Sequence, residues 1–361
     1  MLRYFNADFG NAGSRTHAWG QRARAAVEHA RDRIAAVVDA RRGDVIFTSG
    51  ATESNNLAIL GLTAASPHRL HIVSTAIEHH AILEPLAELK KRGFDVTEVR
   101  PDASGQVHAD AVLGEVRADT LLVTVMHVNN ETGVIQPIRE IADRLDDGVY
   151  FHVDGAQGFA RELEGLRHPR VDLISVSAHK INGPKGIGAL VAKRRGGQRA
   201  PLQPLMFGGG QERGLRPGTL PVPLIAGFGL AAELAIIERE TRASRCAAFR
   251  ASLLSGLAPL GGLVNGEITR SVPYILNLSF PGVEAEVVID AWKDLVAVSN
   301  GAACTSQTYT CSHVLAAMRL PAWRANGAVR FSWYAETPEP DWHALVATLE
   351  PHRIADRALE R

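Results

Sequence analysis

The segment SVSAHK at residues 175–180 closes an apolar run that begins at Leu173, and the glycine-rich GPKGIG follows at residues 183–188. The run predicts a buried strand over residues 173–176, so Lys180 lies just past a strand end, beside a histidine and small residues. Lys180 could form a Schiff base, for which its amine needs a lowered pKa in order to act at neutral pH. A solvated loop lysine is the alternative.

A second polar cluster, HVDGAQ at residues 152–157, also follows a predicted strand. Asp154 ends this strand, which spans residues 149–153. A carboxylate there loses hydration unless a cationic or hydrogen-bonding group meets it, and a protonated pyridine nitrogen would serve. Capping of the next turn is the alternative explanation for this aspartate.

A third cluster, TSGATES at residues 48–54, follows a strand predicted over residues 45–48. A glycine, small hydroxyl residues and the free amides of a helix start form an anion cradle suited to a phosphate. The alternative is an ordinary Ser or Thr cap of the helix. No Gly-Lys-Ser/Thr follows and no GxGxxG appears after the first strand, so nucleotide-binding fingerprints are absent.

The three clusters belong to a longer alternation of short apolar runs and helical patterns over the first 225 residues. The predicted strands are residues 45–48, 70–74, 96–99, 121–125, 149–153, 173–176 and 188–192. The predicted helices include residues 23–38, 80–92, 109–116 and 138–145. Strands this apolar are buried on both faces, which predicts a mainly parallel sheet between helices, with ligands at the carboxyl ends of its strands.

From about residue 225 the pattern changes to one long helix that runs toward residue 255. Segments at 274–279, 285–292, 297–299, 313–318 and 329–332, and a helix from Asp341, predict a smaller α+β domain. We therefore expect a large domain over residues 9–238. The small domain takes residues 239–361 together with residues 1–8.

Composition narrows the functional class. Of 361 residues 46% are hydrophobic and 22% charged, as is ordinary for a soluble globular protein of about two domains. Lys plus Arg and Asp plus Glu both number 39, so we expect no extended basic face and no direct nucleic-acid binding. Three cysteines form no disulfide framework, which favours the cytoplasm. We expect no membrane segment and, without HExxH or CxxC motifs, no metal site.

Eight ordered segments resemble the cysteine desulfurase family, in the class V aminotransferase group of fold-type I pyridoxal-phosphate enzymes. They are FGNAGSRTH (9–17), FTSGATESNN (47–56), EHHAI (78–82), MHVNNETG (126–133), VDGAQ (153–157), SAHKINGPKG (177–186), GGGQERGLRPGTLP (208–221) and GAACTS (301–306). The resemblance covers nearly the whole chain. It implies a large domain with a mainly parallel seven-stranded sheet between helices and a smaller α+β C-terminal domain.

The resemblance also implies a cofactor, pyridoxal 5'-phosphate, and a role for each matching residue. Lys180 matches the lysine that holds the cofactor and moves the substrate's Cα proton. Asp154 matches the partner of the pyridinium nitrogen, which makes the ring an electron sink. His79 matches the imidazole that stacks on the ring.

Other matching residues contact the cofactor or the substrate. The phosphate group matches Ala51, Thr52, Ser177 and His179, and the cofactor's phenolic side matches Asn130 and Gln157. Thr219 matches a phosphate contact from a neighbouring subunit, so the family pattern implies a homodimer. Arg330 matches the arginine that pairs with the substrate carboxylate, a task suited to a bidentate donor, and Asn130 is also expected at the substrate.

Cys304, within GAACTS, distinguishes a desulfurase from a plain aminotransferase, in which this cysteine would have no task. It matches the family's nucleophile, which removes sulfur from L-cysteine as a persulfide, releases L-alanine and passes the sulfur to an acceptor protein. A buried small hydrophobe is the alternative for a lone cysteine. Cys311 is either a second sulfur carrier or a bystander, and we expect Cys246 to pack in a helix.

One departure from the family pattern and several alternatives stay open. Only eight residues precede Phe9, where family members usually carry a longer segment, and this motivates a non-catalytic scaffold as an alternative. A selenocysteine lyase would use the same cofactor residues. The sulfur could serve iron–sulfur cluster assembly, tRNA thiolation or DNA phosphorothioation, and FGNAGSRTH with SQTYTCSHVL (306–315) faintly resembles the last branch.

Overall fold

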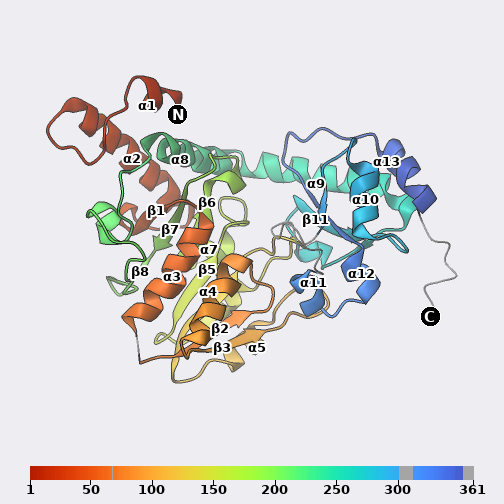
Figure 1. Ribbon diagram of the computed structural model, residues 1–361, viewed down its shortest axis with the longest axis horizontal. Helices are drawn as coiled ribbons and strands as arrows, with labels where there is room; N and C mark the ends of the chain where they lie inside the picture. Colours follow the sequence, from red (N-terminus) through yellow and green to blue (C-terminus); the bar gives the residue numbers. More distant parts are fainter. Residues whose placement is uncertain (67, 301–311, 353–361) are drawn as a thin grey trace. The chain divides into compact units, whose positions relative to one another are not determined.

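The computed structural model describes residues 1–66, 68–300 and 312–352 (Figure 1). The chain forms two compact units, which we call the first and second units. The first unit comprises Met1–Val99, Ala109–His127 and Pro137–Arg239. The second comprises Arg100–His108, Val128–Gln136 and the chain from Glu240 onward.

A seven-stranded sheet forms the centre of the first unit, in the order β1-β7-β6-β5-β4-β2-β3. Its strands are β1 (Val45–Thr48), β2 (His71–Thr75), β3 (Asp95–Val99), β4 (Thr120–Met126), β5 (Tyr150–Asp154), β6 (Leu173–Ser177) and β7 (Gly188–Ala192). All neighbours pair in parallel except β7, which runs antiparallel to β1 and β6. The predicted seven-stranded, mainly parallel sheet is therefore confirmed.

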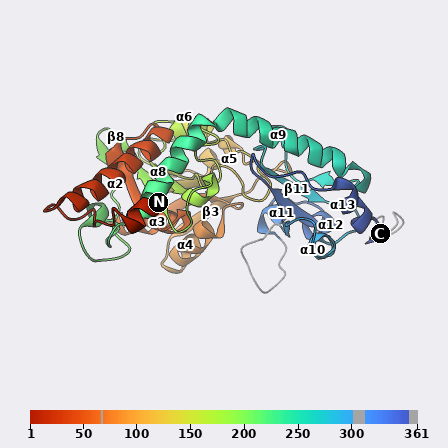
Figure 2. The same ribbon diagram turned by 90° about the horizontal axis from the view of Figure 1, so that it is seen from above.

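Helices cover both faces of this sheet. They are α1 (Leu2–Asn6), α2 (Ala18–Val37), α3 (Ala51–Ala65), α4 (His80–Lys91), α5 (Ala109–Gly114), α6 (Ile138–Arg144), α7 (Glu164–Arg167) and α8 (Val222–Ile237). Short 3-10 helices occupy Arg42–Asp44, Ala178–Ile181 and Gln211–Gly214, and β8 (Arg194–Arg195) pairs with β9 (Gln198–Arg199). Helices α3 and α4 pack together on one side of the sheet, and α6 lies on the other (Figure 2).

The second unit has a four-stranded antiparallel sheet in the order β10-β11-β13-β12. Its elements are α9 (Arg239–Gly256), β10 (Leu263–Val264), β11 (Ile275–Ser279), α10 (Ala285–Trp292), β12 (Ser299–Asn300), α11 (His313–Ala317), α12 (Ala322–Asn326), β13 (Ala328–Ser332) and α13 (Trp342–Leu349). Three 3-10 turns lie at Ala258–Leu260, Ile268–Arg270 and Glu350–His352. Trp292, Phe280 and Phe331 pack in its core, which also buries Cys246 as expected from packing.

The structure corrects three expectations about organisation. The long helix predicted from 225 to 255 is two helices, because the backbone of Glu238 leaves helical geometry at φ −97° and ψ 5°. Residues 1–8 belong to the first unit, where α1 packs on α8 and Asp8 accepts hydrogen bonds from Arg3 and Arg22. Residues 100–108 and 128–136 belong to the second unit.

None of the helices in the described ranges combines the length and apolar character needed to cross a bilayer.

Candidate active site

Asp154, the last residue of β5, is a nearly buried carboxylate held by neutral donors. Only 6% of it is exposed. Asn55 Nδ2 donates to its Oδ2 at 2.8 Å, and the backbone N–H of Ala156 donates to its Oδ1 at 3.0 Å. Among the described residues no lysine or arginine pairs with it. A buried acid that lacks a cation fits a cationic ligand, such as a protonated ring nitrogen.

Asn55 is a site residue that our sequence reasoning missed. It is fully buried on α3, one turn into the helix, and its Oδ1 has no hydrogen-bond partner among the described residues. A signal was present, because Asn55 shares a helical face with the buried Ala58, Ile59 and Leu62. A polar side chain at such a position needs a partner, and here that partner is Asp154.

The start of α3, where the sequence predicts an anion cradle, lies against the end of β6. Gly50 precedes the helix and has no side chain with which to cap the N–H groups of the first turn, where Ala51 and Thr52 lie. A Cβ on Gly188 would come within 2.6 Å of the Gly50 Cα, so glycine permits this close approach. Ser177 Oγ lies 3.6 Å from the position of a Cβ on Gly50. Free amides and the positive end of a helix dipole attract a phosphate.

Ser177 and His179 are joined at the same cradle. Ser177 Oγ and His179 Nδ1 lie 2.9 Å apart in a hydrogen bond. Partial burial of the His179 ring, together with the positive charges of Lys180 and Lys185, lowers the pKa of His179. A neutral imidazole and a hydroxyl can both donate to an anion without carrying charge themselves.

Lys180 lies on the short turn Ala178–Ile181 that follows β6, and it is half-buried. The turn closes at Asn182, which has the left-handed φ of 63°. Gly183 then returns toward Ala178, where a Cβ would lie 2.8 Å from the Ala178 carbonyl oxygen. The turn therefore places Lys180 directly after the strand end, as the sequence predicts.

His79 and Glu78 precede α4, next to the strand ends. His79 caps this helix, and its Nδ1 accepts from the Ala81 N–H at 3.0 Å. Glu78 is fully buried, and its Oε1 accepts from Thr75 Oγ1 at 2.6 Å and from the Met126 N–H at 2.8 Å. Burial, assisted by the negative charge of Asp154, raises the pKa of Glu78 to about 8 against these hydrogen bonds. At neutral pH Glu78 therefore holds a proton.

Two further predicted residues of the first unit lie in loops. Gln157 is half-buried just after β5. Thr219 is exposed in the segment that precedes α8. Glu212 anchors this segment, because its Oε2 accepts from the Phe47 N–H at 2.7 Å and it pairs with the buried Arg31. Arg216 of the same segment donates to Glu53 Oε1 on α3 at 2.9 Å.

The remaining predicted residues belong to the second unit. Arg330 on β13 donates from Nη1 to the Asn130 carbonyl oxygen at 3.1 Å. Its Nε is buried and has no hydrogen-bond partner within the described part of the chain. Arg330 thus keeps donors for an incoming anion such as a carboxylate. Cys304 and Cys311 lie outside the described residues.

The class V aminotransferase family model matches residues 1–345 of this chain. A cysteine desulfurase named IscS from Anaeromyxobacter dehalogenans is 45% identical over 92% of this chain and 82% of that protein. The crystal structure of DndA from Streptomyces lividans is 48% identical, with a TM-score of 0.83 over 92% of this chain and 94% of that one. A NifS-like protein is 33% identical, with a TM-score of 0.86 over 97% and 92% of the two chains.

The chain belongs to the class V aminotransferase family and, within it, to the cysteine desulfurases. Enzymes of this family use pyridoxal phosphate. The first unit of this cysteine desulfurase fits that cofactor at two points. Asp154 is an acid without a cationic partner among the described residues, and the first turn of α3, which follows Gly50 beside Ser177, has no side-chain cap on its N–H groups.

Proposed function

We propose that this chain binds pyridoxal 5'-phosphate and removes sulfur from L-cysteine, giving L-alanine and a persulfide on Cys304 for an acceptor protein. The observation that carries the proposal is Asp154, a carboxylate 6% exposed and held by neutral donors at a strand end. Relatives that are 45% identical to this chain carry the name cysteine desulfurase, which supports L-cysteine as the substrate and L-alanine as the product.

When bound, pyridoxal phosphate supplies a cationic ring that draws electrons from the substrate's Cα. Asp154 keeps the ring nitrogen protonated, and Asn55 holds Asp154 in place. The phosphate is bound by the first turn of α3, at Ala51 and Thr52, and by Ser177 and His179. Lys180 holds the cofactor and then moves the proton at the substrate's Cα.

His79 would pack against the ring, and the N–H of Ala81 already fixes the orientation of its imidazole at the start of α4. Gln157 and Asn130 would provide polar contacts to the cofactor on its phenolic side. Arg330 pairs with the substrate carboxylate through the donors that its contact with Asn130 leaves available. These side chains would orient the cofactor and the substrate as well as supply charge.

The Cys304 thiolate attacks the substrate sulfur. A new S–S bond forms on Cys304, the carbon–sulfur bond of the substrate breaks, and its electron pair stays with the carbon. That carbon takes up one proton to become the methyl group of L-alanine. The persulfide sulfur then passes to an acceptor protein, which leaves Cys304 reduced for another cycle. A reduced thiol is needed throughout, so we place the protein in the cytoplasm.

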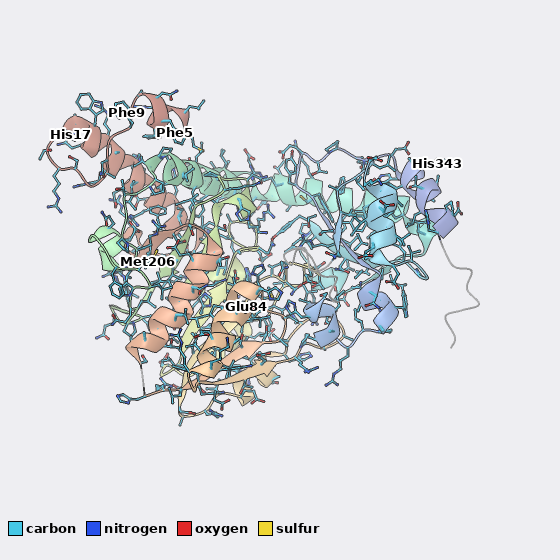
Figure 3. The ribbon with its side chains drawn as sticks, viewed as in Figure 1. Phe5, Phe9, His17, Glu84, Met206 and His343 are labelled. Carbon is cyan, nitrogen blue, oxygen red and sulfur yellow. The ribbon has the colours of Figure 1, made fainter. Side chains whose placement is uncertain are left out.

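We also propose that the working form is a homodimer. Thr219 is exposed, as a contact to a second copy requires. Large apolar side chains are exposed near the N-terminus, where Phe5 is 56% and Phe9 72% exposed. Phe5, Phe9 and His17 lie at the same end of the first unit (Figure 3). Clusters of exposed aromatic side chains are typical of protein interfaces. Light scattering should give twice the chain mass.

An absorbance spectrum followed by L-cysteine addition tests the activity. The protein should absorb in the visible range with bound cofactor, and should release L-alanine. Lys180→Ala should remove both properties. Cys304→Ser should keep the absorbance and lose L-alanine formation, while Cys246→Ser, in the core of the second unit, should retain the reaction.

Other outcomes would contradict the proposal. A protein that stays colourless and inactive with added cofactor would support a scaffold. L-Alanine formed by Cys304→Ser at the parental rate would exclude the proposed nucleophile. Faster release of selenium from selenocysteine, with little action on L-cysteine, would favour a selenocysteine lyase.

A further inference from the structure

The turn Asn129–Gly133 is built as one hydrogen-bonded unit within the second unit. Asn129 Oδ1 accepts from the N–H of Glu131 at 3.0 Å and the N–H of Thr132 at 2.9 Å. Gly133 closes the turn with a left-handed φ of 78°, and a Cβ there would lie 3.0 Å from the Ile275 carbonyl oxygen. The backbone of this turn is therefore tightly constrained.

This turn holds two other segments of the second unit. The Asn130 carbonyl oxygen accepts from Arg330 on β13. The Glu131 carboxyl group accepts from Ser312 Oγ, and the same hydroxyl caps α11 by accepting from the Leu315 N–H. Adjacent residues of one turn thus contact Arg330 and Ser312. Cys304 precedes Ser312 by eight positions in the sequence.

The positive charge of Arg330 also acts on the Glu131 carboxyl group. Glu131 is 2% exposed, and no hydrogen bond joins the two side chains in the described ranges. Burial raises the pKa of Glu131 to about 7, although the Ser312 hydrogen bond and the positive charge of Arg330 oppose this rise. Asn277 on β11 donates to the Glu131 carbonyl oxygen. Among the described residues, the groups that act on Glu131 from other elements are Asn277, Ser312 and the charged Arg330.

We propose that Glu131 is a positioning residue that fixes Ser312 to the turn holding Arg330 and, by keeping or releasing one proton, sets how strongly Arg330 attracts a substrate carboxylate. This inference rests on the proposed role of Arg330. With Glu131 neutral, the positive charge of Arg330 is uncompensated and binds an anion strongly. With Glu131 ionised, its negative charge offsets part of that field and binding weakens.

The proposal has a reciprocal consequence. A carboxylate bound at Arg330 places a second negative charge near Glu131 and raises its pKa further. Binding of the carboxylate near pH 7 therefore takes up a fraction of a proton from solution. Protonation and carboxylate binding support one another, so affinity falls as pH rises through the ionisation of Glu131.

The test uses the cofactor-loaded protein and propionate, which has one carboxylate and neither an amine nor a thiol. Calorimetric titrations from pH 6 to 8, in two buffers of different ionisation enthalpy, give affinity and proton uptake. Wild type should lose affinity about five-fold over this range and take up protons near pH 7. Glu131→Gln should change less than about two-fold and take up fewer protons. For L-cysteine, the wild-type KM should follow the same pH trend more than kcat does.

Ser312→Ala is the second variant, because it removes the hydrogen bond and leaves the carboxyl group. That hydrogen bond lowers the pKa of Glu131, so its loss should move the midpoint of the propionate profile to higher pH. Arg330→Gln should abolish the pH dependence together with most of the binding. Equal pH profiles and proton uptake in wild type and Glu131→Gln, or an unshifted midpoint in Ser312→Ala, would overturn the proposal.

Wild-type desulfuration of L-cysteine is measured separately. If desulfuration is absent but propionate binding depends on pH as expected, only the proposed function is rejected. If desulfuration is present but propionate binding lacks this pH dependence, only the role of Glu131 is rejected.

Discussion

Charged side chains are held in two different ways in the first unit. Near β1, Arg31 and Glu212 are buried and neutralise each other, with Arg31 Nη1 donating to Glu212 Oε2 at 2.8 Å. At the end of β5, Asp154 is nearly as buried but has only the neutral donors of Asn55 and Ala156 among the described residues. Paired buried charges stabilise a fold. A buried charge without a counter-ion indicates a ligand that brings the opposite charge.

Arg330 in the second unit resembles Asp154, because no residue of opposite charge forms an ion pair with it among the described residues. Its Nη1 donates to the carbonyl oxygen of Asn130, and its buried Nε has no hydrogen-bond partner in the described ranges. The two charges have opposite signs and therefore suit different ligand groups. The negative Asp154 suits a cationic cofactor ring, and the positive Arg330 suits a substrate carboxylate.

Asp154→Asn should have the largest effect on function. The amide cannot hold a proton on the ring nitrogen, so loss of this charge pair should cost about 3–5 kcal/mol, or more than a hundred-fold in kcat. L-Alanine release and the cofactor absorbance measure the effect. Asp172→Asn is the matched control, since Asp172 pairs with Arg170 at 2.9 Å in a structural contact. Asp172→Asn should lower the free energy of unfolding and keep the cofactor absorbance. Equal losses of activity in the two variants would show that Asp154 does not differ from a structural carboxylate.

Arg31→Met should act on stability instead. Glu212 then becomes a buried charge without its cation, and the free energy of unfolding should fall by about 3–5 kcal/mol in denaturant titrations. Arg31→Met with Glu212→Met should recover part of this loss, because neither charge is then left unpaired. A single variant as stable as wild type would show that the pair is not structural.

Arg330→Gln should raise the KM for L-cysteine more than it lowers kcat. Loss of charged hydrogen bonds to the carboxylate should cost about 1.5–3 kcal/mol, or ten- to hundred-fold in KM. Steady-state kinetics measure this split. Arg250→Gln is a control in the same unit, because Arg250 contacts Ser271 and Val272 only weakly, at 3.4 and 3.5 Å. An unchanged KM in Arg330→Gln would remove Arg330 from the substrate site.

Glu78→Gln should change how stability depends on pH. The pKa of Glu78 is raised to about 8 in the folded protein, so the folded state binds this proton more tightly than the unfolded state does. The resulting stabilisation is complete below pH about 4.5 and is lost as pH rises to about 8, at roughly 1.4 kcal/mol per pH unit. Unfolding titrations at several pH values should show this slope in the free energy of unfolding of the wild type. In the variant the contribution of Glu78 to the slope should be missing. Parallel curves would contradict a protonated Glu78.

Asn55→Ala should give the smallest effect. Asp154 loses one hydrogen bond from a neutral donor to its carboxylate, worth about 1.5 kcal/mol, and keeps that of Ala156. The cofactor should bind about ten-fold more weakly, as measured by absorbance titration. Asn56→Ala is the matched control, because Asn56 bonds only its own helix, at the Thr52 carbonyl oxygen. Equal effects of the two variants would argue against Asn55 as the support of Asp154.

Local patterns predicted the strand ends well. Asp154 and Lys180 each follow an apolar run, and a charged residue at the end of a buried strand is visible without a structure. The helix start at Ala51 was predictable for the same reason, since its glycine and hydroxyl residues are contiguous. These features could be predicted because their residues are adjacent in the sequence.

Long-range contacts were not predictable in this way. Asn55 supports Asp154 across 99 positions, and Ser312 donates to Glu131 across 181 positions. In the second unit, the turn at Gly133 packs against Ile275, and Gln136 donates to the Gly105 carbonyl oxygen, which joins residues 128–136 to residues 100–108. No local periodicity encodes such packing. The break at Glu238 between α8 and α9 was missed because no proline or glycine stands at or next to that residue in the sequence.

Mass spectrometry of the Cys304 peptide after a single turnover with L-cysteine tests the central claim most directly. We expect one added sulfur atom on Cys304 and one L-alanine per active site in the wild type, and neither product in Lys180→Ala. L-Alanine formed without any added sulfur on Cys304, or sulfur carried first by Cys311 in a Cys304→Ser variant, would contradict the account.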